Sequence, residues 1–111
     1  MPLRYVILRH EDIPDPHYDL MFESAPGSPL MTWRGPDWPI TAPTPLIKLP
    51  DHRAEYLVYE GPLSNNRGVV RRVALGQCEI TPCPNGWRIN MHGQTPDLLL
   101  VQINNDEWLA Q

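Results

Sequence analysis

Residues 85–92, Asn-Gly-Trp-Arg-Ile-Asn-Met-His, contain the clearest secondary-structure signal in the chain. Asn85-Gly86 is a strong β-hairpin signal, because both residues accept the left-handed backbone that a tight two-residue turn requires. Trp87 to His92 then alternate apolar and polar side chains, which is typical of a strand with one buried face. This segment therefore predicts two antiparallel strands that meet at Asn85-Gly86.

Short apolar segments separated by turn signals continue in both directions from this hairpin. Asp51 is a good N-terminal cap, so we expect one helical turn at 51–55. Gly76 is expected to break the strand pattern around it, and a last hairpin is expected around Asn104-Asn105. The expected strands cover residues 4–10, 18–23, 30–33, 46–49, 56–59, 69–74, 78–81, 87–92, 98–103 and 108–109.

Proline makes up 14 of the 111 residues, and this excludes a helical bundle because proline breaks helices. In sheet proteins prolines lie at edges and in loops, so residues 34–45 are expected to form a proline-rich loop. With 41% apolar and 20% charged residues, the chain fits one globular domain over residues 1–111. We predict an all-β fold: a small closed or nearly closed β-barrel with short helical turns and proline-rich loops.

The net charge of −4 argues mildly against general nucleic-acid binding, because such proteins are normally basic. Residues 52–88 are nevertheless locally positive, which fits either a phosphate-binding surface or solvated arginines. No secretory signal and no apolar segment long enough for a bilayer are recognisable, so a cytoplasmic location without membrane contact is expected. Cys78 and Cys83 are then expected to be inert thiols, since two cysteines alone are weak evidence for zinc.

His10, His17, Asp19 and His52 are the candidates for chemistry. His17 and Asp19 lie two residues apart on an expected strand and therefore point to one face, and a short loop returns His10 towards His17. Two imidazoles and a carboxylate can bind a divalent metal with open coordination positions. Surface histidines on a loop rim are the competing interpretation. A third, an Fe(II) oxygenase site closed by His92, lacks the basic residue that would follow this histidine.

Four motifs follow one another along the chain: Val6-Ile-Leu-Arg-His10, His17-Tyr-Asp-Leu-Met-Phe-Glu23, Thr32-Trp33 and Asp51-His-Arg-Ala-Glu-Tyr-Leu-Val-Tyr-Glu-Gly61. In combination they resemble the 3′-phosphoesterase domain of bacterial DNA ligase D. Weaker matches at Gly68-Val-Val, Gly76, Met91-His92-Gly93 and Trp108-Leu109 extend the resemblance over nearly the whole chain. The resemblance implies a DNA-repair enzyme dependent on Mn²⁺ or another divalent metal, which removes a 3′ phosphate or ribonucleotide from nucleic-acid ends.

The resemblance also implies roles for individual residues. His10, His17 and Asp19 correspond to the metal ligands. His52 and Tyr56 correspond to catalytic groups that contact the phosphate or assist proton transfer. Related domains often sit beside polymerase and ligase modules, for which this chain has no room. Those activities would then come from separate ligase or polymerase proteins.

Met21 departs from the family pattern, which has an arginine at this position. Strand alternation places it on the same face as Asp19, where methionine cannot neutralise a phosphoryl charge. Losing one such donor costs on the order of a hundredfold in rate or more. Arg34, Arg71 and Arg72 are the candidates to bind phosphate in its place.

Three possibilities therefore stay open from the sequence. The chain is an active metal-dependent phosphoesterase, a degenerate relative that binds metal, nucleic-acid ends or a partner protein without turnover, or an unrelated barrel enzyme or binding module. Glu23 also lies on the expected site face. It either supports a metal-bound histidine through a hydrogen bond or is a solvated carboxylate.

Overall fold

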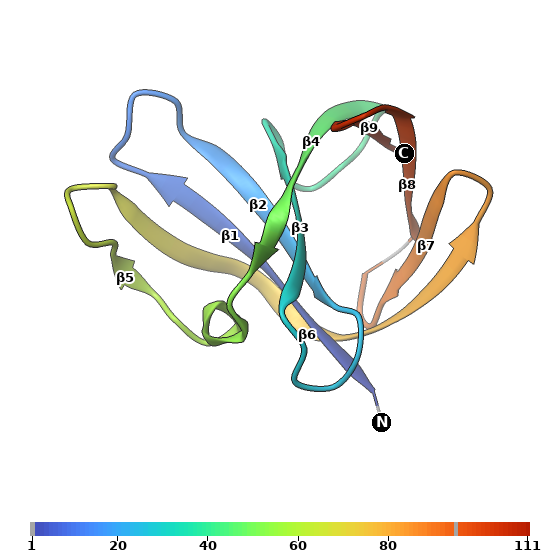
Figure 1. The fold of residues 1–111 in the computed structure, drawn as a ribbon, viewed down its shortest axis with the longest axis horizontal. Coiled ribbons are helices and arrows are strands. Elements are labelled where there is room, and N and C mark those ends of the chain that lie inside the picture. Colours follow the sequence, from blue (N-terminus) through green and yellow to red (C-terminus); the bar gives the residue numbers. More distant parts are fainter. Residues whose placement is uncertain (1, 95) are drawn as a thin grey trace.

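The computed structural model describes residues 2–94 and 96–111, which form nine strands and one short 3-10 helix (Figure 1). Every strand pairing is antiparallel. The predicted all-β fold is thus confirmed. The elements are β1 (Leu3–Glu11), β2 (His17–Glu23), β3 (Leu30–Gly35), β4 (Thr44–His52), η1 (Ala54–Leu57), β5 (Gly61–Pro62), β6 (Val69–Cys83), β7 (Gly86–Met91), β8 (Leu98–Asn104) and β9 (Glu107–Ala110).

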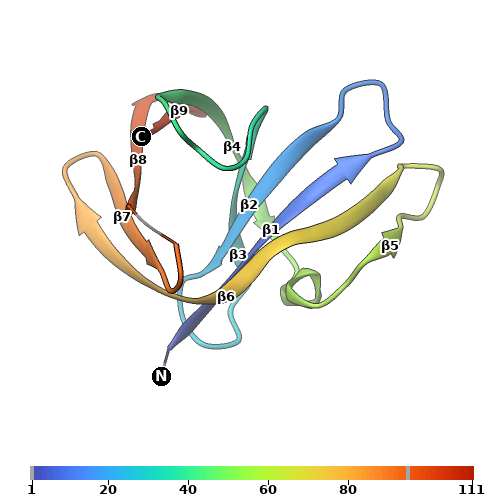
Figure 2. The same cartoon turned by 180° about the vertical axis from the view of Figure 1, so that it is seen from behind.

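Eight of the strands form a ring-like sheet in the order β1-β2-β3-β4-β9-β8-β7-β6, and β6 closes it by pairing with β1. The long β6 connects two parts of this ring, because residues 69–78 pair with β1 and residues 78–83 pair with β7. Figure 2 shows β6 curving from one partner to the other. β5 lies beside the start of β6, outside the ring.

The expected break at Gly76 is wrong, because β6 is continuous from Val69 to Cys83. Gly76 has a φ of +154°, and an added Cβ would lie 3.4 Å from the Tyr5 ring. The glycine therefore lets the strand bend across this ring instead of ending it. The expected hairpin is present, but Cys83 pairs with Gly86, so the turn residues are Pro84 and Asn85.

The segment after β4 also differs from expectation. Asp51 lies within β4 and caps nothing, whereas Arg53 is the N-cap of η1 and makes no side-chain cap hydrogen bond. The segment 56–59, expected as a strand, consists of the end of η1, a turn at Val58 and an irregular residue, Tyr59. Burial of Leu57 and packing of Tyr56 against the sheet explain why a helical turn forms without a cap.

The sheet is covered on both faces. An inner core fills the ring, with Ile7, Leu20 and Trp33 among its fully buried side chains. A second group on the outer face, here called the outer cluster, lies beneath η1 and β5. The outer cluster consists of Val6, Leu8, Met21, Leu30, Leu57 and Val70, with Tyr56 and Leu63 packed against it. Because the outward residues of β1 and β2 alternate with the inner ones, the candidate site described below shares this outer face.

Cys78 and Cys83 are both free thiols. They lie five residues apart on the extended β6, which is too far for a disulfide. In the described part of the chain, η1 falls far below the length and apolar character that crossing a membrane requires.

Candidate metal centre

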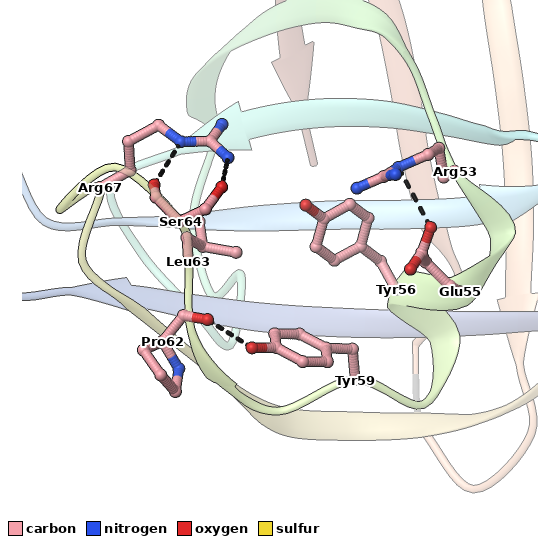
Figure 3. A pocket seen from close by; sticks show the side chains of 8 residues that line it. All are labelled: Arg53, Glu55, Tyr56, Tyr59, Pro62, Leu63, Ser64 and Arg67. Carbon is pink, nitrogen blue, oxygen red and sulfur yellow. Dashed lines mark hydrogen bonds and ion pairs between the residues drawn. The ribbon is translucent and has the colours of Figure 1, made fainter.

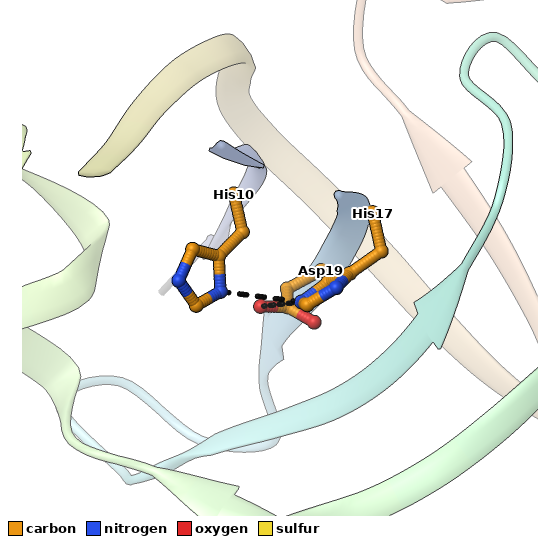
Figure 4. A group of neighbouring side chains, drawn as sticks. All are labelled: His10, His17 and Asp19. Carbon is orange, nitrogen blue, oxygen red and sulfur yellow. Dashed lines mark hydrogen bonds and ion pairs between the residues drawn. The ribbon is translucent and has the colours of Figure 1, made fainter. Parts of the chain in front are cut away.

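His10, His17 and Asp19 come together where β1 and β2 meet their connecting turn (Figure 4). His10 and His17 are directly opposite each other in the register of the two strands. Asp19 lies two residues further along β2 and therefore shares their face. One ligand atom from each residue lies within 4.8 Å of the other two. The predicted grouping is therefore present in the structure.

Both imidazoles are held by backbone carbonyls. His10 Nε2 lies 2.6 Å from the carbonyl oxygen of Arg67, and His17 Nδ1 lies 2.8 Å from that of Asp15. A carbonyl oxygen can only accept, so these two nitrogens carry the protons. In the neutral rings the remaining nitrogens, His10 Nδ1 and His17 Nε2, present their lone pairs to the centre of the cluster.

These two facing nitrogens are only 3.2 Å apart, and Asp19 Oδ2 lies 3.6 Å from His17 Nε2. Two lone pairs and a carboxylate repel one another at such distances unless a cation lies among them. That cation is either a proton on one ring or a metal ion. The cluster is therefore built for a positive charge at its centre.

Two of the three separations between the ligand atoms fit a divalent metal, and the atoms of the third pair lie within 4.8 Å of each other. Ligand atoms about 2.0–2.2 Å from a metal ion lie about 2.8–3.6 Å from one another in octahedral or tetrahedral geometry. The two short separations in the cluster fall in this range. Mixed imidazole and carboxylate donors suit divalent manganese, iron or zinc. Three protein ligands leave positions for water and substrate, as a catalytic site requires.

Asp19 is 4% exposed and uses its two oxygens in different ways. Oδ2 faces His17, whereas Oδ1 accepts a hydrogen bond from Arg34 Nε at 3.2 Å. Burial pushes the pKa of Asp19 up, but the contacts with His17 and Arg34 outweigh burial and lower it. The carboxylate is therefore ionised near neutral pH, which metal ligation requires. Arg34 is held beside it because Asp19 and Arg34 are paired across β2 and β3.

The other two predicted phosphate-binding arginines lie apart from this cluster. Arg71 points to the sheet face opposite that of His10, since Val70 is the partner of His10, and it donates to Glu11 at 2.9 Å. Arg72 shares the outer face but its Nε lies 3.5 Å from Glu60 Oε1. Of the three arginines, Arg34 is the one that contacts a candidate metal ligand.

His52 and Tyr56 lie against each other at the end of β4 and in η1, with ring centroids 6.0 Å apart. Tyr56 packs on the outer cluster, which includes Met21, the next outward residue of β2 after Asp19. His52 Nδ1 lies 2.9 Å from the carbonyl of Pro50. The pair is thus on the outer face, beyond Met21, and neither residue belongs to the metal cluster.

Glu23 and His92, two further candidates from the sequence, do not take part in the cluster. Glu23 is buried at the opposite end of β2 from His17, where it accepts hydrogen bonds from Arg4 and Gly27, so it is neither solvated nor a partner of a metal ligand. His92 Nε2 lies 3.4 Å from Glu79 and is outside the cluster, which excludes the oxygenase arrangement. The carbonyls of Asp15 and Arg67 were missed, because a backbone acceptor has no signature in the side-chain sequence.

The chain matches no protein-family model and no curated protein. A function is therefore inferred from the residues of the site.

Proposed function

We propose that this protein is a divalent-metal-dependent phosphoesterase that trims 3′ ends of nucleic acid, with Mn²⁺ as its metal. The convergence of two imidazole lone pairs and the ionised Asp19 on one point carries the proposal. The same three residues match the metal-ligand motif of the ligase D 3′-phosphoesterase that the sequence resembles. That resemblance supports the choice of reaction.

The residues around the cluster suit phosphate chemistry. A divalent metal bound here supplies a Lewis acid for a phosphoryl oxygen and a site for the attacking water. Arg34 adds a cation beside Asp19 that can bind a phosphoryl oxygen through its free N–H groups. His52 and Tyr56 offer an imidazole and a phenol on the same outer face as proton donors to the phosphate or to the leaving oxygen.

A catalytically degenerate binder is the second candidate, and Met21 is the observation that favours it. Its side chain is 1% exposed within the outer cluster, so the outward position of β2 next to Asp19 carries no charge. Such a protein would hold a metal, a nucleic-acid end or a partner protein without turnover.

As part of the proposal, the protein works in the cytoplasm on nucleic-acid 3′ ends. The two free thiols are consistent with a reducing compartment. Repair would then be completed by ligase or polymerase proteins separate from this chain.

The test is incubation with Mn²⁺ and a primer-template that carries a 3′ phosphate or one 3′ ribonucleotide. We compare the wild-type protein with Asp19→Asn, which is nearly isosteric, and with His92→Ala, which removes a histidine outside the cluster. We expect wild-type and His92→Ala proteins to produce a 3′ hydroxyl. We expect Asp19→Asn to lose about 100-fold or more in rate. Losing only a partner that orients a metal ligand already costs about 10- to 100-fold, and this substitution changes a ligand itself.

Mn²⁺ binding, followed by electron paramagnetic resonance, separates the two candidate functions. Binding without trimming in the wild-type protein, weakened in Asp19→Asn, would support the degenerate binder. Trimming that survives unchanged in Asp19→Asn would contradict the proposal, because the reaction would then be independent of this cluster.

A further inference from the structure

A pocket of about 430 Å³ opens between η1 and the loop that follows β5 (Figure 3). Its charged and aromatic lining consists of two arginines, two tyrosines and one carboxylate: Arg53, Arg67, Tyr56, Tyr59 and Glu55. The Glu55 carboxylate is paired with Arg53. The pocket adjoins the metal cluster through Arg67, whose side chain lines the pocket while its carbonyl oxygen holds His10 Nε2 at 2.6 Å. One imidazole ring therefore separates the backbone of this pocket residue from the candidate metal position.

Arg67 is also unusual in its charge. Among the arginine and lysine side chains that the structure describes, it alone has no carboxylate within 4.0 Å. The chain has a net charge of −4, yet no acidic side chain in its described part neutralises this guanidinium, so it is available to bind an external anion. The other basic residues each have an acidic partner: Arg4, Arg9, Arg34, Lys48, Arg53, Arg71, Arg72 and Arg88.

The guanidinium of Arg67 is held in place by Ser64. Its Nε donates to the Ser64 carbonyl at 2.9 Å and one Nη2 hydrogen donates to Ser64 Oγ at 3.0 Å. Three of its five N–H donors remain for a ligand. Figure 3 shows that the guanidinium of Arg53 points towards that of Arg67, with the Tyr56 hydroxyl between them. Donors thus converge on the pocket from two sides, as a phosphate requires.

We propose that Arg67 binds the phosphodiester immediately upstream of the 3′ terminus, so that this pocket is the subsite for the penultimate nucleotide. The inference rests on the proposed function and adds to it a preference for strands over mononucleotides. When the terminal phosphate lies at the metal cluster, the next part of the nucleic-acid strand lies beside it. Arg67 adjoins the cluster there and, among the arginines that the structure describes, is the one without an acidic partner. The rings of Tyr56 and Tyr59 offer apolar faces on which a base can stack.

The test compares Arg67→Gln with Arg88→Gln, which removes the same charge from an exposed position on β7. Binding of a single-stranded oligonucleotide with a 3′ phosphate is measured with Mn²⁺ over a series of salt concentrations. We expect Arg67→Gln to weaken binding about tenfold at low salt and to reduce the salt slope by about 0.7, the effect of one lost phosphate contact on a single strand. Arg88→Gln should match the wild type, and Arg67→Lys should restore the slope.

Binding of a nucleoside 3′-monophosphate and of inorganic phosphate shows which phosphate Arg67 contacts. Neither ligand contains a phosphodiester, so neither can make the proposed contact. We expect their affinities to be equal in wild-type and Arg67→Gln proteins. Weakening of either ligand by Arg67→Gln would overturn the assignment to the upstream phosphodiester. An unchanged oligonucleotide affinity in Arg67→Gln, with an unchanged melting temperature, would overturn it as well.

The 3′-phosphate trimming assay distinguishes the failure of this inference from failure of the proposed function. If the wild-type protein trims and Arg67→Gln binds strands equally well, the inference alone fails. If the wild-type protein does not trim, the proposed function fails and the inference falls with it.

Discussion

Glu23 shows how a single buried carboxylate secures the end of β2. Its oxygens accept hydrogen bonds from the Arg4 backbone N–H at 2.7 Å, Arg4 Nη2 at 3.3 Å and the Gly27 N–H at 2.8 Å. Burial pushes the pKa of Glu23 up, but these donors outweigh burial and lower it below the usual 4.5. Because the pKa is lower in the folded state, ionised Glu23 stabilises the fold above pH 4.5. That contribution is lost as pH falls through the folded-state pKa.

We predict that Glu23→Gln lowers the free energy of unfolding by about 1–3 kcal/mol at pH 7, because charge-assisted hydrogen bonds are replaced by weaker ones. The difference from wild type should shrink at an acidic pH below the folded-state pKa of Glu23, where its carboxylate is protonated. Urea unfolding at the two pH values measures this. Glu107→Gln, at an exposed position, controls for the loss of one charge. An equal loss at both pH values would show that ionisation of Glu23 does not contribute.

At the same scale, the grouping of His10, His17 and Asp19 could be predicted from the sequence whereas the orientation of their side chains could not. The spacing of His17 and Asp19 on a strand fixes their common face, and a short turn fixes the partner strand. The tautomer of His10 depends on the carbonyl of Arg67, which is 57 residues away along the chain. Which arginine lies beside Asp19 likewise depends on the β2–β3 register. Such long-range pairings follow from the closed sheet, and local sequence patterns do not predict them.

Among the elements, the loop from β5 to β6 matters most for the site. It carries Arg67 and ends at Gly68, whose φ is +86°. A Cβ on Gly68 would lie 2.3 Å from the carbonyl oxygen of Glu11 and 2.7 Å from Ile13 Cγ2. The loop can therefore pack against the end of β1 only with glycine at this position. That packing sets where the Arg67 carbonyl meets His10.

We predict that Gly68→Ala displaces this loop and weakens Mn²⁺ binding about 10- to 100-fold, the usual cost of losing a partner that orients a metal ligand. Gly93→Ala is the matched control. Gly93 has a nearly identical φ of +87°, but an added Cβ there meets nothing within 4 Å. Electron paramagnetic resonance titration of both variants measures the effect. Equal Mn²⁺ affinity in the two variants would mean that the loop does not orient His10.

Element boundaries were predictable where local pattern and tertiary packing agree. The proline-rich loop spans 36–43, within the expected 34–45, and both expected hairpins are present, each with its turn shifted by one residue. The expected break in β6 is wrong because a glycine that breaks an isolated strand is tolerated where β1 pairs with it and the Tyr5 ring supports the bend. The expected start of the helical turn at Asp51 is wrong because the position of η1 is set by burial of Leu57 and not by a cap.

For the whole molecule, β1 is the centre of the architecture. It pairs with β2 on one edge and with β6 on the other, which closes the ring. Its inward side chain at Ile7 belongs to the inner core, and its outward side chains at Val6 and Leu8 belong to the outer cluster. All three residues are fully buried. The candidate metal cluster at the end of β1 is therefore anchored to a strand whose middle residues are fully buried on both faces.

We predict that the amide protons of Val6, Ile7 and Leu8 exchange with solvent only through global unfolding, because releasing β1 opens the ring and exposes both groups of buried side chains. β5 has only two residues and pairs on β6 alone, so the segment around it should exchange through smaller openings that leave the ring closed. Native-state hydrogen exchange at increasing denaturant measures both opening energies. If β1 and the β5 region exchanged with the same opening energy, the pocket and the ring would unfold as one unit. Arg67 could then not move independently of the candidate metal ligands.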